Sequence, residues 1–224
     1  NEGNIFEIAD SKSPNFNGNI LFNHRFHKKG RTLSVNVNAG RSSTEGTDDI
    51  ENDNTYYFNG NIFDSSYIQQ VNQDNNNHSY GIRTSYVEPL SKKRSLEFNY
   101  AYNRQYTGND KKTYAIDPQN GGKTYVDTLS NIYDNVYTTN RFGVNFRTTE
   151  KKYNYTIGLA VQPATISSNT LTGIKTNYTQ HLVNYYPVIR FAYNFSRSRS
   201  FNLNYNGSTS QPSFSQLQPV ADVS

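Results

Sequence analysis

The sequence of 224 residues contains no cysteine, no methionine and no tryptophan. Without cysteine there is no disulfide framework and no thiolate metal site. Long hydrophobic runs are missing as well, because no segment approaches the ~18 consecutive apolar residues that a membrane helix requires. Residues 1–4 (NEGN) show no signal-peptide pattern and do not begin with methionine, so we expect a cut inside a longer protein or a mature end.

Hydrophobic residues are scarce: they make up 33% of the chain, and the mean hydropathy is -0.85. A soluble globule of this length carries about half apolar residues. Low hydrophobicity alone favours disorder, but disordered chains are poor in aromatic residues. This chain has 19 tyrosines and 13 phenylalanines. Its composition therefore predicts an ordered structure with one apolar face and one wet face.

Apolar and polar residues alternate with a period of two along most of the chain, as in residues 33–40 (LSVNVNAG). This period is typical of β-strands. Four tight basic turns lie near 27–30, 91–94, 149–152 and 196–199, and polar segments that we expect to be long loops lie near 43–77, 108–134 and 165–180. Residues 55–72 are expected to extend a hairpin. The pattern predicts eight strands in four hairpins, each about 10–14 residues long, which is enough to cross a bilayer.

Two architectures share this alternation, a soluble β-sandwich and a membrane barrel. Three features favour the barrel. The strands are longer than the five or six residues typical of globular proteins. Short and long connections alternate strictly, and the polar face is rich in asparagine and glycine but poor in lysine and glutamate. We therefore predict an all-β fold, an antiparallel up-and-down transmembrane β-barrel of about eight strands that forms part of a larger barrel and fills residues 1–224.

The polar face of these strands supplies the candidate functional residues. In a barrel this face lines the lumen, where amide and guanidinium groups can contact water, a plug or a polar solute. Plain hydration or plug contact is the alternative to specific substrate binding. The predicted lumen-facing residues are Asn36, Asn38, Arg83, Asn99, Asn103, Arg141, Asn145, Arg147, Arg190, Asn202 and Asn204.

No catalytic signature is present, so we expect neither an enzyme nor a cofactor. The net charge of +4 and the basic turns permit nucleic-acid binding, but the basic residues lie at hairpin tips rather than along a groove, and we expect no nucleic-acid partner. His24 and His27 are the only histidines near each other, and they are expected on different faces. Residues 44–54 are acidic and form either a Ca²⁺ site or, as we expect, a solvated loop.

Three phrases resemble a known family: residues 85–93 (SYVEPLSKK) with 96–100 (LEFNY), residues 153–162 (YNYTIGLAVQ), and residues 193–199 (YNFSRSR) leading to 210–220 (SQPSFSQLQPV). They are similar to the barrel of TonB-dependent outer-membrane receptors, in the branch called outer membrane protein beta-barrel. Such barrels have about 22 strands around a plug. Neither a plug domain, a TonB box nor a terminal strand that ends in an aromatic residue is recognisable, so we expect a fragment.

The resemblance implies a location in the outer membrane and contact with its lipid bilayer. It also implies partners of the parent protein: a plug domain, a TonB-type energy-coupling protein and an imported nutrient such as a metal chelate, vitamin, peptide or glycan. Two alternatives remain open on the sequence. One is a soluble β-rich binding or adhesin module, and the other is a complete small outer-membrane barrel with a structural role.

Overall fold

The computed structural model describes residues 2–58, 61–173 and 175–209. The phrase at 210–220 that contributed to the family resemblance lies outside these residues. Within the described residues no helix has the length and apolar character needed to cross a membrane.

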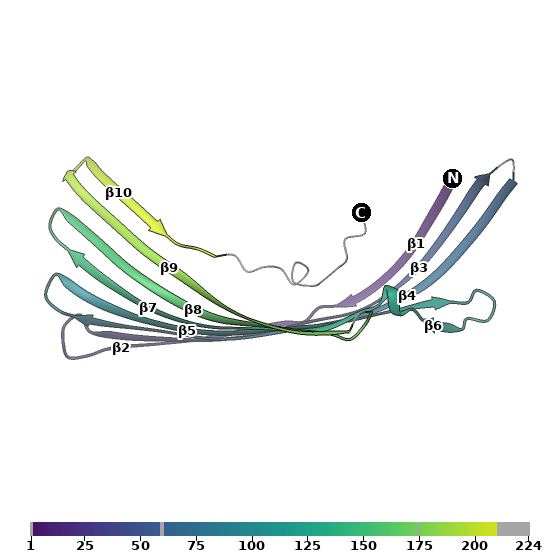
Figure 1. Cartoon of the computed structure of the whole chain (residues 1–224), viewed down its shortest axis with the longest axis horizontal. Helices are drawn as coiled ribbons and strands as arrows, with labels where there is room; N and C mark the ends of the chain where they lie inside the picture. Colours follow the sequence, from purple (N-terminus) through teal and green to yellow (C-terminus); the bar gives the residue numbers. More distant parts are fainter. Residues whose placement is uncertain (1, 59–60, 174, 210–224) are drawn as a thin grey trace.

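The strands form one antiparallel sheet, and almost every strand pairs with its neighbours in sequence (Figure 1). This meander confirms the predicted antiparallel all-β fold. The elements are β1 (Glu2–Lys12), β2 (Asn15–Arg25), β3 (Thr32–Phe58), β4 (Asn61–Pro89), β5 (Arg94–Ile116), β6 (Lys123–Tyr125), the 3-10 turn η1 (Asp127–Leu129), β7 (Asn131–Thr149), β8 (Tyr153–Thr170), β9 (Thr176–Ser196) and β10 (Arg199–Asn206).

Strands β1 and β2 follow the same edge of β3 in one continuous register. Lys12 pairs with Glu45, and Asn15 pairs with Ser42. The interruption falls at Ser13 and Pro14, because proline has no N–H to donate to the ladder. The sheet therefore has eight long strands, with the short β6 added to β5. The sequence alternation did not identify β1.

The segments expected to be long loops are mostly strand. β3 and β4 stay paired from Thr32 and Val87 up to Phe58 and Asn61. β5 continues to Ile116, while β8 reaches Thr170 before β9 begins at Thr176. Main-chain hydrogen bonds form such ladders whatever the side chains are. The expectation of loops was therefore wrong for most of these residues, whereas the hairpin extension expected within 55–72 is present in β3 and β4. Polar residues dominate both alternating sets in 43–54 and 72–77, so these stretches carry no apolar period.

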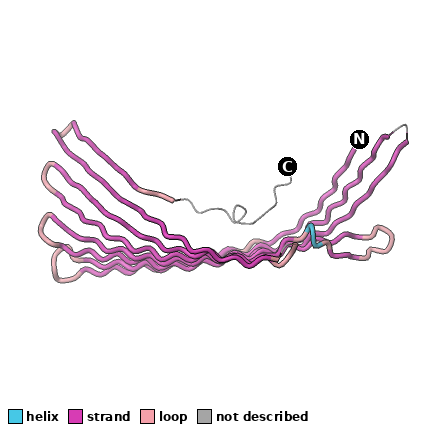
Figure 2. The backbone as a smooth tube through the Cα atoms, viewed as in Figure 1, coloured by secondary structure: helices cyan, strands magenta, loops and turns pink. Residues whose placement is uncertain are grey.

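Residues 117–130 form the longest connection between described strands, and they fold back onto β5. The hydroxyl of Thr113 donates to the carbonyl of Leu129 (2.9 Å), and the N–H of Thr113 donates to the Ser130 hydroxyl (3.0 Å). Thr113 is 1% exposed as a result. This connection contains β6 and η1 and lies at the end of the sheet opposite the short turns (Figure 2).

The four short turns gather at one end of the sheet (Figure 1). They connect β2 to β3, β4 to β5, β7 to β8 and β9 to β10. The first contains Gly30 at φ +88, a conformation that favours glycine. In the described residues β10 pairs only with β9, and β1 and β2 pair only with β3. The sheet is curved and open.

Candidate functional site

One face of the sheet carries a belt of apolar and aromatic side chains near the short turns. Cross-strand pairing aligns mostly apolar and aromatic side chains. One row across five strands consists of Val35, Thr84, Tyr100, Phe142 and Val161. The apolar belt consists of Ile20 and Phe22 of β2; Leu33, Val35 and Val37 of β3; Tyr80, Ile82 and Tyr86 of β4; Leu96, Phe98, Tyr100 and Tyr102 of β5; Phe142, Val144 and Phe146 of β7; Tyr155, Ile157, Leu159 and Val161 of β8; Tyr185, Ile189 and Phe191 of β9; and Phe201, Leu203 and Tyr205 of β10.

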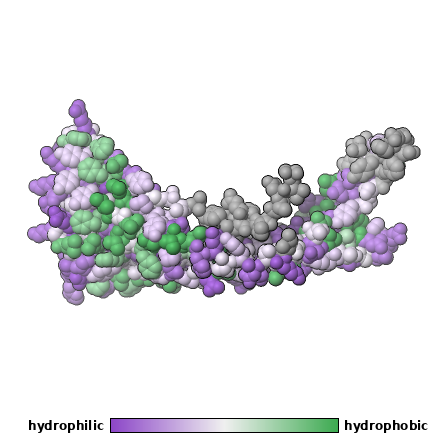
Figure 3. Space-filling view, viewed as in Figure 1, coloured by the Kyte–Doolittle hydropathy of each residue, from purple (hydrophilic) through white to green (hydrophobic). Residues whose placement is uncertain are grey.

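The apolar belt is not packed into a core. Phe142 and Ile157 are each 55% exposed, although both lie on interior strands. A soluble protein rarely exposes an apolar surface that runs across a whole sheet. In Figure 3 hydrophobic residues gather in the half of the molecule that bears the short turns. The exposed belt is what a lipid-facing surface requires.

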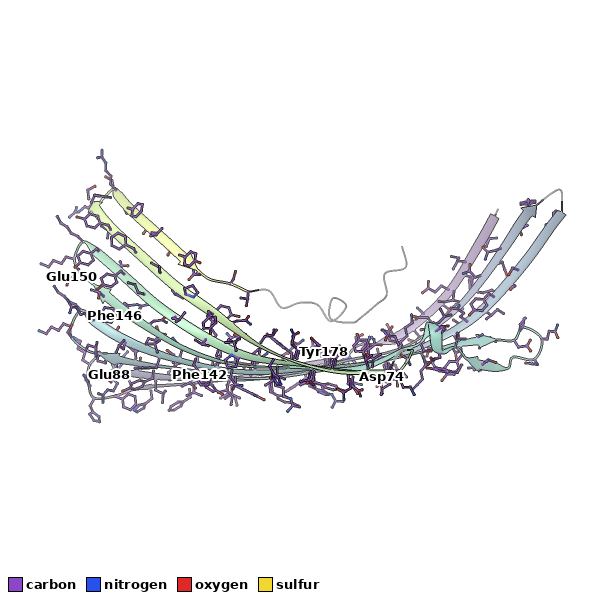
Figure 4. The ribbon with its side chains drawn as sticks, viewed as in Figure 1. Asp74, Glu88, Phe142, Phe146, Glu150 and Tyr178 are labelled. Atoms are coloured by element: carbon purple, nitrogen blue, oxygen red, sulfur yellow. The ribbon has the colours of Figure 1, made fainter. Side chains whose placement is uncertain are left out.

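The same face becomes charged beyond the apolar belt. A hollow of about 540 Å³ lies there, farther from the short turns than the apolar belt. Lys112 and Asp110 form an ion pair in it (2.7 Å). Figure 4 shows this order along the strands: Glu88 and Glu150 at the turns, Phe146 and Phe142 in the apolar belt, and Asp74 farther on. The charged side chains that line the hollow are Asp10, Lys12, Glu45, Asp74, Asp110 and Lys112.

Aromatic rings contact each other where the apolar belt meets the short turns. His24 packs edge-on against Phe26 (ring centroids 4.5 Å apart), and Phe26 contacts Tyr86 (6.2 Å). Tyr153 stacks on Tyr155 (6.4 Å). Aromatic residues with a polar tip suit the boundary between hydrocarbon and headgroups. His24 therefore belongs to an aromatic cluster.

Glu88 connects the first short turn to β4. Its carboxylate accepts hydrogen bonds from Lys28 Nζ (2.5 Å), Arg31 Nε (2.8 Å) and Tyr86 Oη (2.6 Å). On β4 it lies beyond Tyr86, the last residue of the apolar belt, and so outside the membrane-spanning part. The hydrogen bonds from Arg31, Lys28 and Tyr86 lower the pKa of Glu88 to about 2.

We expect Glu88→Gln to lower the melting temperature at pH 7, because the substitution removes the carboxylate that joins Lys28 and Arg31. A carboxyl whose folded pKa is depressed stabilises the protein above its ordinary pKa and loses that effect as the pH falls toward the folded pKa. The difference from wild type should therefore shrink between about pH 4.5 and pH 2. Thermal unfolding across this range tests the prediction. Glu51→Gln, at an exposed position of β3, serves as the control, and an equal shift in both variants would contradict it.

The opposite, polar face holds all eleven predicted lumen-facing residues in two hollows. The larger, of about 630 Å³, crosses β3 to β9 and contains Asn36, Asn38, Arg83, Asn99, Asn103, Arg141 and Asn145. The smaller, of about 300 Å³, contains Arg147, Arg190, Asn202 and Asn204. The structure thus brings the predicted residues together on one face. That this face lines a lumen stays a prediction.

Three asparagines of the polar face lie across glycines of the neighbouring strand. Asn17 pairs with Gly40, Asn38 with Gly81, and Asn145 with Gly158. A Cβ placed on Gly40 would come within 2.7 Å of Asn17 Oδ1, and one on Gly158 would collide with the Asn145 amide. The absence of a side chain on each glycine gives the amide room to lie along the sheet surface.

The contacts between side chains of the polar face are not evident from the sequence. The guanidinium of Arg141 lies 4.0 Å from the centroid of the Tyr186 ring, a cation–π contact between β7 and β9. Tyr186 is 9% exposed. The Glu97 carboxylate accepts a hydrogen bond from Ser85 Oγ (3.0 Å). Alternation along β9 places Tyr186 on the same face as Arg190, but its contact with Arg141 depends on the strand register.

The acidic segment 44–54 lies in β3 and is not the loop that we expected. Asp48 and Asp49 therefore point to opposite faces, because successive side chains of a strand alternate. Asp49 accepts a hydrogen bond from Gln70 Nε2 (2.7 Å). In the described part of the chain, no three histidine or acidic side chains are grouped so that they could hold a metal ion.

An antiparallel sheet with an exposed apolar belt, bounded by aromatic clusters and then by charge, defines the wall of an outer-membrane β-barrel. Comparison with protein families agrees. The profile of the outer membrane protein beta-barrel family matches residues 24–224. The chain belongs to this family, and its place is the outer membrane. This confirms the predicted location and the family resemblance, and it excludes the soluble alternative. A comparison with curated proteins found no match.

Solved structures share the fold. One is BauA, the ferric preacinetobactin receptor from Acinetobacter baumannii, with a TM-score of 0.50 and 14% identity over 86% of this chain and 30% of that one. The ferric citrate transporter FecA (TM-score 0.45, 11% identity, 80% of this chain and 27% of that one) aligns less well. So does the copper transporter OprC (TM-score 0.45, 8% identity, 84% and 36%). The chain thus spans about a third of the length of the structures that it matches.

Proposed function

We propose that this chain is part of the barrel wall of an outer-membrane receptor that takes up a nutrient. The observation that carries the proposal is the open, membrane-belted sheet, which has the fold of the BauA wall and covers 30% of that chain. In this role the chain supplies wall and surface extensions and catalyses nothing. Both outer strands of the described sheet have an unpaired edge, which supports a larger barrel over a complete eight-stranded one.

The proposal includes an orientation. Outer-membrane barrels have short turns on the periplasmic side and longer extensions outside. We therefore place the four basic turns at the periplasm, and the paired ends of β3 and β4 outside the cell. The charged hollow around Asp74 and Lys112 then lies above the membrane, where ionised side chains remain hydrated.

The proposal also assigns the polar face to the lumen. Asparagines present donors and acceptors without net charge, and Arg83 and Arg141 add cations that favour anionic groups. A plug domain, water or the passing nutrient would contact this face. Energy would come from a TonB-type protein that acts on the parent receptor. The nutrient belongs to the class of metal chelates, vitamins, peptides or glycans.

Uptake tests the function. Deleting the gene for the full-length protein should abolish uptake of one labelled nutrient from a panel of ferric chelates, cobalamin, oligopeptides and oligosaccharides. Dissipating the inner-membrane proton gradient should abolish the same uptake. The double variant Arg83→Gln/Arg141→Gln should reduce it, whereas Lys175→Gln, far from both polar hollows, should not. If deletion leaves the uptake of every compound unchanged, the proposed function is wrong.

Cysteine labelling tests the orientation, because this chain has no cysteine of its own. We expect Asp74→Cys to react with a membrane-impermeant maleimide on intact cells, since Asp74 lies in the charged hollow. Lys92→Cys, in the second short turn, should react only after the outer membrane is permeabilised. The reverse pattern would overturn the proposed orientation.

A further inference from the structure

Basic residues concentrate at the end of the sheet that bears the short turns. We define the basic rim as the segments 26–31, 88–94, 149–152 and 196–199. It contains ten of the 22 lysines and arginines in the chain, but two of the 18 aspartates and glutamates, namely Glu88 and Glu150. The net charge of the whole chain is +4, so the remainder of the chain carries an excess of acidic residues.

The rim is continuous from turn to turn, because main-chain and side-chain contacts join its segments. The N–H of Thr149 donates to the Lys93 carbonyl (2.8 Å). On the other side of the third turn, the N–H of Asn194, two residues before the fourth segment, donates to the Lys152 carbonyl (2.7 Å). The Lys28–Glu88 ion pair connects the first turn to the second. The basic residues thus form one band at the end of the sheet.

The two carboxylates neutralise part of this band. Glu88 binds Lys28 and Arg31, and Glu150 binds Lys93 at 2.5 Å. Within the described residues, the other seven rim cations form no ion pair with a carboxylate. All seven are exposed. These seven are Lys29, Lys92, Arg94, Lys151, Lys152, Arg197 and Arg199.

The aromatic side chains beside the rim indicate its level in the bilayer. The belt tyrosines Tyr86 and Tyr155 and the neighbouring Tyr153 lie next to it, at the level where aromatic rings meet lipid headgroups. Arg94 pairs with Thr148, which pairs with Tyr155, so a rim cation and the apolar belt share one row of the apolar face. Cations at this level are within reach of lipid phosphates.

We propose that the basic rim binds the phosphate groups of anionic phospholipids in the leaflet that touches the short turns. The ligand is a phospholipid with a net negative headgroup, such as phosphatidylglycerol, and its acyl chains lie against the apolar belt. Charge complementarity carries the assignment, since unpaired cations beside an apolar surface match a phosphate attached to acyl chains. A soluble polyanion fits this membrane-embedded surface less well, because it has no acyl chains to lie against the apolar belt.

Competitive lipid binding tests the inference. The full-length protein that carries this chain is purified in detergent and offered equal amounts of phosphatidylglycerol and phosphatidylcholine with the same acyl chains. Native mass spectrometry then measures the ratio of the two bound lipids. The wild type should prefer phosphatidylglycerol. The variant Lys92→Gln/Arg94→Gln/Lys151→Gln/Lys152→Gln should lower the ratio at least fivefold, because each cation near an anionic surface contributes independently.

A matched variant removes the same charge elsewhere. Lys12→Gln/Lys111→Gln/Lys123→Gln/Lys175→Gln changes lysines that lie outside the basic rim and should leave the ratio within twofold of wild type. Heat-modified gel migration confirms that both variants are folded. An unchanged ratio in the rim variant, or an equal fall in both variants, overturns the proposal. The inference uses the membrane location and not the transported nutrient, so its failure leaves the uptake experiment unaffected, and the converse also holds.

Discussion

Phe142→Arg is expected to destabilise the protein by about 2–4 kcal/mol, the cost of an arginine at the bilayer midplane of a barrel. Phe142 belongs to the apolar belt on an interior strand, is 55% exposed, and has its ring 5.0 Å from that of Tyr100. A guanidinium at this position would face hydrocarbon and could not retain its hydration. Denaturant titration of the full-length protein in lipid vesicles measures the difference.

Two control substitutions test whether the free-energy cost depends on the depth of the arginine in the bilayer and on the face of the sheet that carries it. Tyr153→Arg places the same side chain next to the short turns, where the cost should fall to about 0–1 kcal/mol. Asn103→Arg places it in the larger polar hollow, where water or polar groups can solvate it. If Phe142→Arg and Asn103→Arg cost the same free energy, the apolar belt does not face lipid.

Gly158→Ala should cost about 1–3 kcal/mol, the usual range for overpacking. A Cβ at Gly158 would collide with the Asn145 amide and lie 2.9 Å from the Val144 carbonyl oxygen. The Asn145 side chain would have to leave its place across β8. The unfolding free energy of the full-length protein measures the loss, and Asn145→Ala/Gly158→Ala should recover part of it, because contacting residues couple.

Gly18→Ala is the matched control, because the nearest atoms to a Cβ on Gly18 are 3.8 Å away. Both substitutions reduce the flexibility of the unfolded chain to the same extent, so the difference between them reports on the space in the folded sheet. Equal stabilities of the two variants would show that the Asn145 amide moves aside at no cost.

Sequence alternation predicted the face of each candidate residue. Asn36, Asn38 and Arg83 lie opposite to Val35, Val37 and Ile82 because side chains of a strand alternate. Where the alternation is apolar against polar, this rule identifies both the strand and its two faces. The eleven predicted residues therefore lie on one face of the structure, and the expected meander is present.

Alternation identifies no strand where both faces are polar. Residues 43–54 and 73–77 read as loop because polar side chains dominate both alternating sets, yet β3 and β4 remain paired there. Backbone hydrogen bonds support this extension, with β1 paired to β3 and β5 paired to β4 along part of it, and such pairing leaves no period in the sequence. Alternation likewise did not identify β1, which pairs with the extended part of β3.

The sequence by itself determined the class of this protein, a membrane-facing, antiparallel β wall with its basic turns at one end. Alternation and turn composition depend only on residues that are near each other in the chain, so they can be read without the structure. Only the tertiary structure decided which residues meet across strands. The contact of Asn145 with Gly158, the cation–π pair of Arg141 and Tyr186, and the joining of the turns into one basic rim all depend on strand register. Register is a relation between distant segments, set by the whole ladder of hydrogen bonds and cross-strand packing.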